Sequence, residues 1–392
     1  MLREILDRAD RRAGVEARRA LLRFLNGLDW LLRDPQAVVG RTPHKVILQQ
    51  GKLMVRQYHL GSVKPRFATP VVLIPPLMVK PFIYDLYPGR SLVEFLLESG
   101  FRPYVVDFGE PDEADQFVRL DQYVMEWLPA ACRAVREDAG TPTLTLLGYC
   151  MGGVFCLMYV AAHDDRDVHN LVCIATPVDM SKMGLLAWVA KLAGRQVEVL
   201  ARQMGNVPGG LSSTAFRLLT PMKNLTRYTD LFLNLWNHEY VLGFEAMNQW
   251  IKQFIDYPRD AFVQFTRDFM QQNKLARGQL TLGGRVVHLR DVKSSLLVFA
   301  GKTDQVAPPA SVRALMDKVG STDKTFILVP AGHMGILAGA NAPSQVWQPM
   351  ARWLEVRSQP ATRSSRVQRQ AAAPMASQSS RKRVPQRVSA GK

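Results

Sequence analysis

The sequence predicts an α/β protein whose mostly parallel, doubly wound sheet carries a helical cap insertion. Short apolar runs alternate with helical patterns, as in buried parallel strands that are joined by crossover helices. The interval from residue 177 to about 291 is too long for a simple crossover and contains several helical patterns. Apolar residues make up 47% of the 392, which is ample for a large core.

The elements follow in chain order. Residues 46–60 look like a hairpin, and 152–163 read as a helix directly after a strand. Within the long interval, residues 225–254 have a helical pattern. The glycines of 278–286 fit a hairpin turn, because no strand-to-helix transition there carries a phosphate-binding motif. The remaining strands are expected at 71–74, 102–108, 144–149, 171–176, 295–300 and 325–329.

We expect three parts: an N-terminal helical segment at 1–40, a catalytic domain at 41–357 with its cap insertion at about 177–291, and a disordered basic tail at 358–392. The tail has almost no large apolar side chains with which to offset ordering entropy. It also holds much of the formal charge of +16. Two readings stay open: a solvated extension, or a weak, salt-sensitive site for an anionic partner such as nucleic acid or a phospholipid-coated surface.

Four cysteines lie in apolar surroundings without the spacing of a metal site or the density of a disulfide scaffold. The sequence shows neither a signal-peptide pattern nor an apolar stretch of membrane-spanning length. We therefore expect a cytoplasmic protein and no metal site. Structural, surface or packing roles are expected for His163, His169, His238, His288, Cys132, Cys156 and Cys173.

The stretch LLGYCMGG at 146–153 places Cys150 in a G-x-C-x-G motif between a predicted strand and a predicted helix. A nucleophile elbow requires this context. The helix N-terminus favours a thiolate, and the N–H of Met151 lies where an acyl oxyanion would form. The alternative is a buried structural cysteine in a turn bracketed by glycines.

The partners of such a nucleophile follow it as an acid and then a histidine, each after a late strand. Asp304 and His333 each lie four residues beyond a predicted strand. His333 would remove the thiol proton and return a proton to the leaving group. Asp304 would orient the imidazole or act on a substrate hydroxyl, and the sequence leaves both roles open. Asp179 and Asp291 are rival acids, but a turn after the penultimate strand favours Asp304.

A second oxyanion donor is expected in the loop after the strand at 71–74. Pro75 and Pro76 have no N–H to donate, so Leu77 and Met78 are the candidates. We favour Met78.

The chain resembles the polyhydroxyalkanoate synthases of the short class III type over roughly residues 40 to 357. The resemblance rests on LLGYCMGG, ATPVDM, RQMGNVPGGL, KTDQVAPP, PAGHMGIL and several longer stretches. It implies an α/β-hydrolase fold in which Cys150 carries the acyl group, Asp304 is the catalytic aspartate and His333 is the general base. The implied reaction transfers (R)-3-hydroxyacyl groups from coenzyme A to a growing polyester and releases CoA. Acyl-CoA is a substrate here, and no cofactor is implied.

The resemblance also implies a second synthase subunit, a homo-oligomer and association with the polyester granule. Three features depart from the family pattern: Gln305 stands where a histidine is usual, Phe108 stands where a tryptophan is common, and the basic tail is additional. The aromatic-rich stretch at 231–244 would line an acyl pocket or a subunit interface, or pack the cap's own core. Rival functions are a thioesterase or polyester depolymerase that uses the same cysteine, and a non-enzymatic tethering protein.

Overall fold

The computed structural model describes residues 2–32, 38–61, 63–218 and 221–361. Within them, an eight-stranded sheet has the order β1-β2-β4-β3-β5-β6-β9-β10. β1, β2 and β4 pair antiparallel, and every pair from β4 to β10 is parallel. The predicted sheet and its strands are confirmed, with bounds β1 (His44–Gln50), β2 (Leu53–Tyr58), β3 (Pro70–Ile74), β4 (Arg102–Asp107), β5 (Leu144–Tyr149), β6 (Val168–Ile174), β9 (Ser295–Gly301) and β10 (Lys324–Val329).

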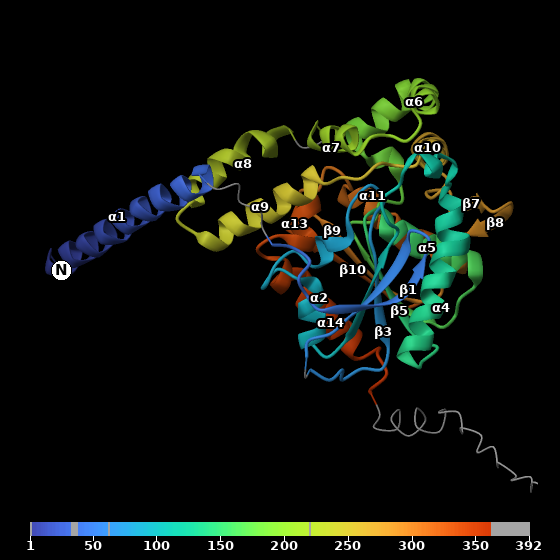
Figure 1. Cartoon of the computed structure of the whole chain (residues 1–392), viewed down its shortest axis with the longest axis horizontal. Coiled ribbons are helices and arrows are strands. Elements are labelled where there is room, and N and C mark those ends of the chain that lie inside the picture. The colour runs from blue at the N-terminus through green and yellow to red at the C-terminus, as the bar shows by residue number, and fades with distance from the viewer. Residues whose placement is uncertain (1, 33–37, 62, 219–220, 362–392) are drawn as a thin grey trace, which may run out of the picture. The chain divides into compact units, whose positions relative to one another are not determined.

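Helices cover both faces of the sheet. Every residue of β3 and β5 is buried, as expected for central strands with helices on either side. In Figure 1, α4 and α5 lie on one side of the sheet, and α2 and α14 lie on the other. The bounds are α2 (Leu92–Glu98), α3 (Leu120–Gln122), α4 (Leu128–Ala139), α5 (Met151–His163), α11 (Pro309–Arg313), α12 (Leu315–Lys318), α13 (His333–Ala338) and α14 (Gln348–Glu355).

The interval between β6 and β9 is an insertion, since these two strands are neighbours in the sheet. In the part that the structure describes, it contains five α-helices and the predicted hairpin, here β7 (Gln279–Leu282) and β8 (Arg285–His288). Its attachment to the loop after β3 includes a hydrogen bond of 3.0 Å from the Trp250 indole to the Lys80 carbonyl. The helices are α6 (Gly184–Met204), α7 (Gly209–Leu218), α8 (Pro221–Asn234), α9 (His238–Lys252) and α10 (Arg259–Gln264).

The N-terminal segment forms α1 (Leu2–Leu32), which contacts the turn between α8 and α9. Asn26 donates a hydrogen bond of 2.5 Å to the Leu235 carbonyl, and the Arg19 guanidinium lies 4.6 Å from the Trp236 ring centre. At the other end, Gln359 and Pro360 pair with the backbone of 67–68. From residue 362 onward, the predicted basic tail lies outside the described residues.

Among the described residues, no helix is both long enough and apolar enough to cross a membrane.

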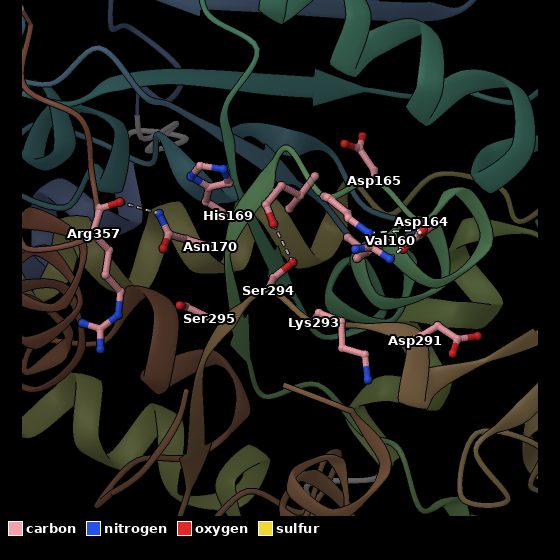
Figure 2. A pocket seen from close by; sticks show the side chains of 12 residues that line it. Val160, Asp164, Asp165, His169, Asn170, Asp291, Lys293, Ser294, Ser295 and Arg357 are labelled. Carbon is pink, nitrogen blue, oxygen red and sulfur yellow. Dashed lines mark hydrogen bonds and ion pairs between the residues drawn. The ribbon is translucent and has the colours of Figure 1, made fainter. Parts of the chain in front are cut away.

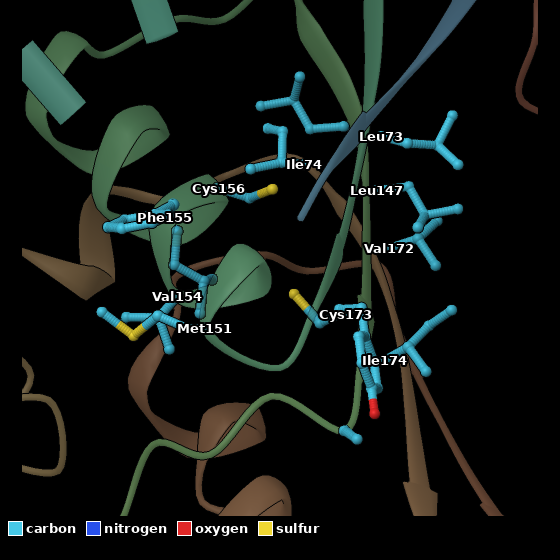
Figure 3. Close-up of a cluster of buried hydrophobic side chains, with 14 of the residues drawn as sticks. Leu73, Ile74, Leu147, Met151, Val154, Phe155, Cys156, Val172, Cys173 and Ile174 are labelled. Carbon is cyan, nitrogen blue, oxygen red and sulfur yellow. The ribbon is translucent and has the colours of Figure 1, made fainter. Parts of the chain in front are cut away.

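The core around α5 fixes the position of that helix against the sheet. Figure 3 shows Val154, Phe155 and Cys156 of α5 on one side of the strands, whereas Leu73 and Leu147 lie on the other side. All five side chains are fully buried. The apolar side chains of the strands and those of the almost wholly apolar α5 therefore form one continuous core.

Glycines allow the backbone of α5 to lie directly against the ends of the neighbouring strands. A Cβ at Gly152 would lie 2.0 Å from the Ile74 carbonyl oxygen, and a Cβ at Gly153 would lie 1.9 Å from Thr176 Oγ1. A Cβ at Gly148 would lie 2.3 Å from the Gly153 nitrogen. No side chain fits these positions unless the helix moves away from the ends of β3 and β5.

We predict that Gly152→Ala lowers the free energy of unfolding by about 3 kcal/mol, since the new methyl group must displace backbone and not a flexible side chain. Gly210→Ala in α7 is the matched control, because nothing lies within 4 Å of its Cβ position. This variant should be as stable as the wild type or up to about 1 kcal/mol more stable. Urea unfolding measures both, and equal values for the two variants would contradict the packing described.

Candidate active site

Cys150 occupies a strained turn between β5 and α5. Its backbone has φ 52° and ψ −120°, a conformation that costs a non-glycine residue of the order of 1–3 kcal/mol. A hydrogen bond of 2.8 Å from the Cys150 N–H to the Ile174 carbonyl holds the turn, and the Cys150 carbonyl accepts from Gly153 N–H at 3.1 Å. The half-buried thiol therefore lies at the carboxyl edge of the sheet, as the predicted elbow requires.

Tyr84 holds this turn through its hydroxyl group. Nothing in the sequence indicated this role. Its hydroxyl donates to the Ile74 carbonyl at 2.8 Å and accepts from the Tyr149 N–H at 3.2 Å. The side chain is fully buried. Tyr84 therefore ties the end of β3 to the end of β5, next to the nucleophile.

Asp304 and His333 come together although 29 residues separate them in the chain. His333 Nδ1 lies 2.8 Å from Asp304 Oδ2. The other carboxylate oxygen accepts N–H groups of Val306 at 2.9 Å and Ala307 at 2.8 Å. The Asp304 side chain is fully buried, so both of its oxygens are committed to groups of the protein.

The neighbouring charges shift the pKa of His333. Burial lowers this pKa, but the charges of Asp304 and Cys150, and hydrogen bonds to both side chains, raise it to about 10. The imidazole is therefore the shared neighbour of the thiol and the carboxylate. The structure brings together all three residues that the sequence singled out.

The rival acids lie elsewhere. Asp179 caps the short helical turn Met180–Lys182 and accepts hydrogen bonds from Ser181 and Asn273. Asp291 ends the turn Leu289–Asp291 and lines a different pocket. Neither is hydrogen-bonded to His333 within the described part of the chain, which favours Asp304 as the acid.

The fold of the chain is shared with known hydrolases. Residues 70–340 match the α/β hydrolase fold family. Two similar solved structures are the monoacylglycerol lipase of Paleococcus ferrophilus, with a TM-score of 0.50 and 17% identity, and a soluble variant of the monoglyceride lipase of Saccharomyces cerevisiae, with a TM-score of 0.53 and 12% identity. They cover 78% and 83% of this chain, and this chain covers 99% of each of them. At these identities the likeness concerns the fold alone.

Curated relatives are more similar in sequence. The poly(3-hydroxyalkanoate) polymerase subunit PhaC of Allochromatium vinosum is 32% identical over 84% of this chain and 93% of its own length. The chain belongs to the poly(3-hydroxyalkanoate) polymerase PhaC family. The PhaC subunit of Synechocystis sp. is 30% identical, with 86% of this chain and 90% of that protein covered. The PhaC subunit of Haloferax mediterranei is 33% identical over 83% of this chain, but only 66% of that longer protein is covered. The family resemblance read from the sequence motifs is thus confirmed.

Two departures from the expected PhaC pattern leave the site intact. Gln305 is exposed, whereas the adjacent Asp304 is buried, so the substitution at 305 does not alter the pair with His333. Phe108 packs edge-on against Tyr123 and Phe155 at ring distances of 5.0 and 5.9 Å. An aromatic ring therefore fills the position in which a tryptophan was expected.

The cap contacts the loop that was predicted to supply a second oxyanion donor. Met78 has a positive φ of 61°, and its carbonyl accepts the Ile255 N–H at 3.0 Å. Met151 is the first residue of α5, where N–H groups have no acceptor within the helix. The donation of both N–H groups to an acyl oxygen remains a prediction of this PhaC site.

A pocket of about 410 Å³ opens next to His333. Its wall includes Phe216 of α7, whose ring centre lies 6.2 Å from that of His333, and Tyr240 and Phe244 of α9. Leu231 and Leu235 of the aromatic-rich stretch 231–244 pack together, and Trp30 of α1 packs against them. The stretch thus contributes both to a pocket wall and to the packing of the cap against α1.

A second pocket, of about 370 Å³, lies at the amino ends of β6 and β9, the opposite edge from Cys150. Figure 2 shows its polar groups bonded to one another: Asn170 donates to the Arg357 carbonyl at 3.3 Å, and Ser294 donates to the Val168 carbonyl at 2.6 Å. The Arg357 guanidinium pairs with Asp323 at 2.8 Å. These groups are engaged in holding the edge of the sheet.

The other cysteines are buried in the core. Burial raises the pKa of Cys132 and of Cys173 to about 12 and raises that of Cys156 as well. These thiols therefore stay protonated near neutral pH, in agreement with the predicted packing role. His163, the predicted structural histidine, lies 3.1 Å from the Val124 carbonyl.

We predict that Asp304→Asn lowers the pKa of His333, since the variant loses the carboxylate charge that stabilises the imidazolium. NMR titration of the imidazole measures the change. In the wild type, folding raises this pKa from 6.5 to about 10, so the stabilisation is fully present below pH 6.5 and is lost as the pH rises through about 10. The stability difference between wild type and variant should shrink over that range.

Asp179→Asn is the control for the loss of a carboxylate, because Asp179 belongs to a different turn. It should leave the titration of His333 unchanged. An unchanged titration in Asp304→Asn would contradict the pairing.

Proposed function

We propose that the chain is a polymerising acyltransferase that moves (R)-3-hydroxyacyl groups from coenzyme A to a growing polyester through an acyl group on Cys150. The observation that carries the proposal is the hydrogen bond of 2.8 Å between Asp304 and the imidazole that neighbours Cys150, in a chain of the PhaC family. The name of the Allochromatium vinosum relative is the source of the substrate class.

In the first step, the Cys150 sulfur attacks the thioester carbonyl while its proton is held on His333, whose imidazolium the Asp304 carboxylate stabilises. The tetrahedral oxyanion accepts the backbone N–H groups of Met151 and Met78. Collapse of this intermediate breaks the bond to the coenzyme A sulfur, which leaves with the proton held by His333. The acyl group then remains on Cys150 as a thioester.

In the second step, a hydroxyl group attacks this thioester, gives its proton to His333 and frees the Cys150 sulfur. An ester bond forms, and the polyester grows by one unit. Asp304 orients the imidazole and stabilises the imidazolium, since both of its oxygens are already engaged and its side chain is fully buried. The same contacts argue against direct contact between Asp304 and a substrate hydroxyl.

A polymerase must keep water from the acyl thioester. His333 is 7% exposed, and Phe216 of the cap packs beside its ring. The cap is further joined to the loop after β3 by the hydrogen bonds from Trp250 and Ile255. Restricted access of water around His333 favours transfer to the hydroxyl end of a chain over transfer to water.

The partners follow from this chemistry. They are an (R)-3-hydroxyacyl-CoA, the end of a polyester chain or granule surface, and a second synthase subunit, as the class III resemblance implies. A homo-oligomer is part of the same proposal.

We predict that Cys150→Ala abolishes the release of CoA from 3-hydroxybutyryl-CoA, with a rate loss of about a thousandfold or more, because no sulfur remains to accept the acyl group. Cys132→Ala is the matched control: it removes a buried thiol of α4 and should keep its activity. Both are assayed for CoA and for polymer, with and without a candidate second subunit.

The products show whether a polyester hydroxyl or water accepts the acyl group. Polymer and CoA from wild type, with both lost in Cys150→Ala, support the proposal. Equal CoA release from wild type and Cys150→Ala would overturn the nucleophile. CoA together with free hydroxy acid and no polymer would identify a thioesterase or depolymerase.

A further inference from the structure

Tyr257 lies in the short segment between α9 and α10, where the cap contacts the catalytic domain. Its backbone forms two hydrogen bonds of 2.9 Å with Val207. Two residues earlier, the Ile255 N–H donates to the carbonyl of Met78 in the predicted oxyanion loop. The position of Tyr257 is therefore fixed from both sides.

The hydroxyl of Tyr257 is enclosed but has no hydrogen-bond partner among the described residues. The side chain is 5% exposed, and its ring packs edge-on against Phe262 at 5.6 Å. An unpartnered buried hydroxyl costs about 1–3 kcal/mol relative to one that is hydrogen-bonded. A buried group without a partner calls for an explanation, and a catalytic role is one of those known.

The segment that carries this hydroxyl borders the predicted oxyanion loop. The residues on either side of it, Asp256 and Pro258, line a small cavity together with Met78 and Tyr123. Burial raises the pKa of Tyr257 well above its usual value, and the charges of Tyr123 and Cys150 raise it further. The phenol is therefore neutral near neutral pH.

We propose that the Tyr257 hydroxyl binds the 3-oxygen of the acyl group that Cys150 carries. The inference rests on the proposed function. The thioester carbonyl has the backbone N–H groups of Met151 and Met78 as donors, so the 3-oxygen is the acyl group's remaining polar atom. A neutral phenol both donates and accepts, which suits the free hydroxyl of an incoming substrate and the ester oxygen of a chain.

The test compares Tyr257→Phe with the wild type on two substrates, 3-hydroxybutyryl-CoA and butyryl-CoA, which lacks the 3-oxygen. The rate of the first CoA released per enzyme is measured by rapid quench. We expect Tyr257→Phe to lose about tenfold on 3-hydroxybutyryl-CoA and less than about twofold on butyryl-CoA. Tyr104→Phe is the matched control, because it removes a hydroxyl that donates to Asp138 at 2.8 Å. Its rate should be unchanged on both substrates.

The outcomes are distinct. An equal loss on both substrates would mean that the hydroxyl acts on the thioester, and no loss on either would mean that it binds no acyl oxygen. Each result overturns the inference while leaving the proposed function in place. The proposed function itself fails if wild type releases no CoA from 3-hydroxybutyryl-CoA, and the inference then fails with it.

Thermal unfolding gives a second readout, independent of activity. Removal of a buried hydroxyl that has no partner should leave the Tm unchanged or raise it. A lower Tm for Tyr257→Phe would show that the hydroxyl already has a structural partner, and would overturn the inference.

Discussion

The close approach of α5 to the ends of β3 and β5 is the constraint on which the rest of the structure depends. Glycines at 148, 152 and 153 allow backbone to meet backbone, and Cys150 is thereby held in a positive-φ turn at the carboxyl edge of the sheet. Strain at one residue is small beside the burial of an almost wholly apolar helix. Burial of α5 thus offsets the backbone strain that orients the Cys150 thiol.

The candidate site is assembled from segments that are far apart in the sequence. Asp304 and His333 follow β9 and β10. Because the strands from β4 onward are parallel, their carboxyl ends meet at one edge, and loops that follow different strands converge there. The insertion between β6 and β9 adds Phe216 and Tyr257 to the same region, so the cap contributes side chains as well as cover.

Much of this was predictable from the sequence because it depends on local patterns. Apolar runs mark the strands, a G-x-C-x-G after a strand marks the elbow, and Asp304 and His333 stand at equal offsets from late strands. Tyr84 and Tyr257 escaped prediction, since their roles depend on which backbone lies opposite them in the folded chain. The aromatic stretch 231–244 divides between a pocket wall and the contact with α1, and this division depends on packing that the sequence does not show.

The central claim, that Cys150 carries the acyl group, is tested most directly by trapping that group. Wild-type protein is mixed with 3-hydroxybutyryl-CoA and quenched in acid, and its peptides are then analysed by mass spectrometry. We expect a mass increase of one 3-hydroxybutyryl group, or a short oligomer of it, on the peptide that contains Cys150. An acyl group on a different residue, or CoA release without any acylated peptide, would contradict the account.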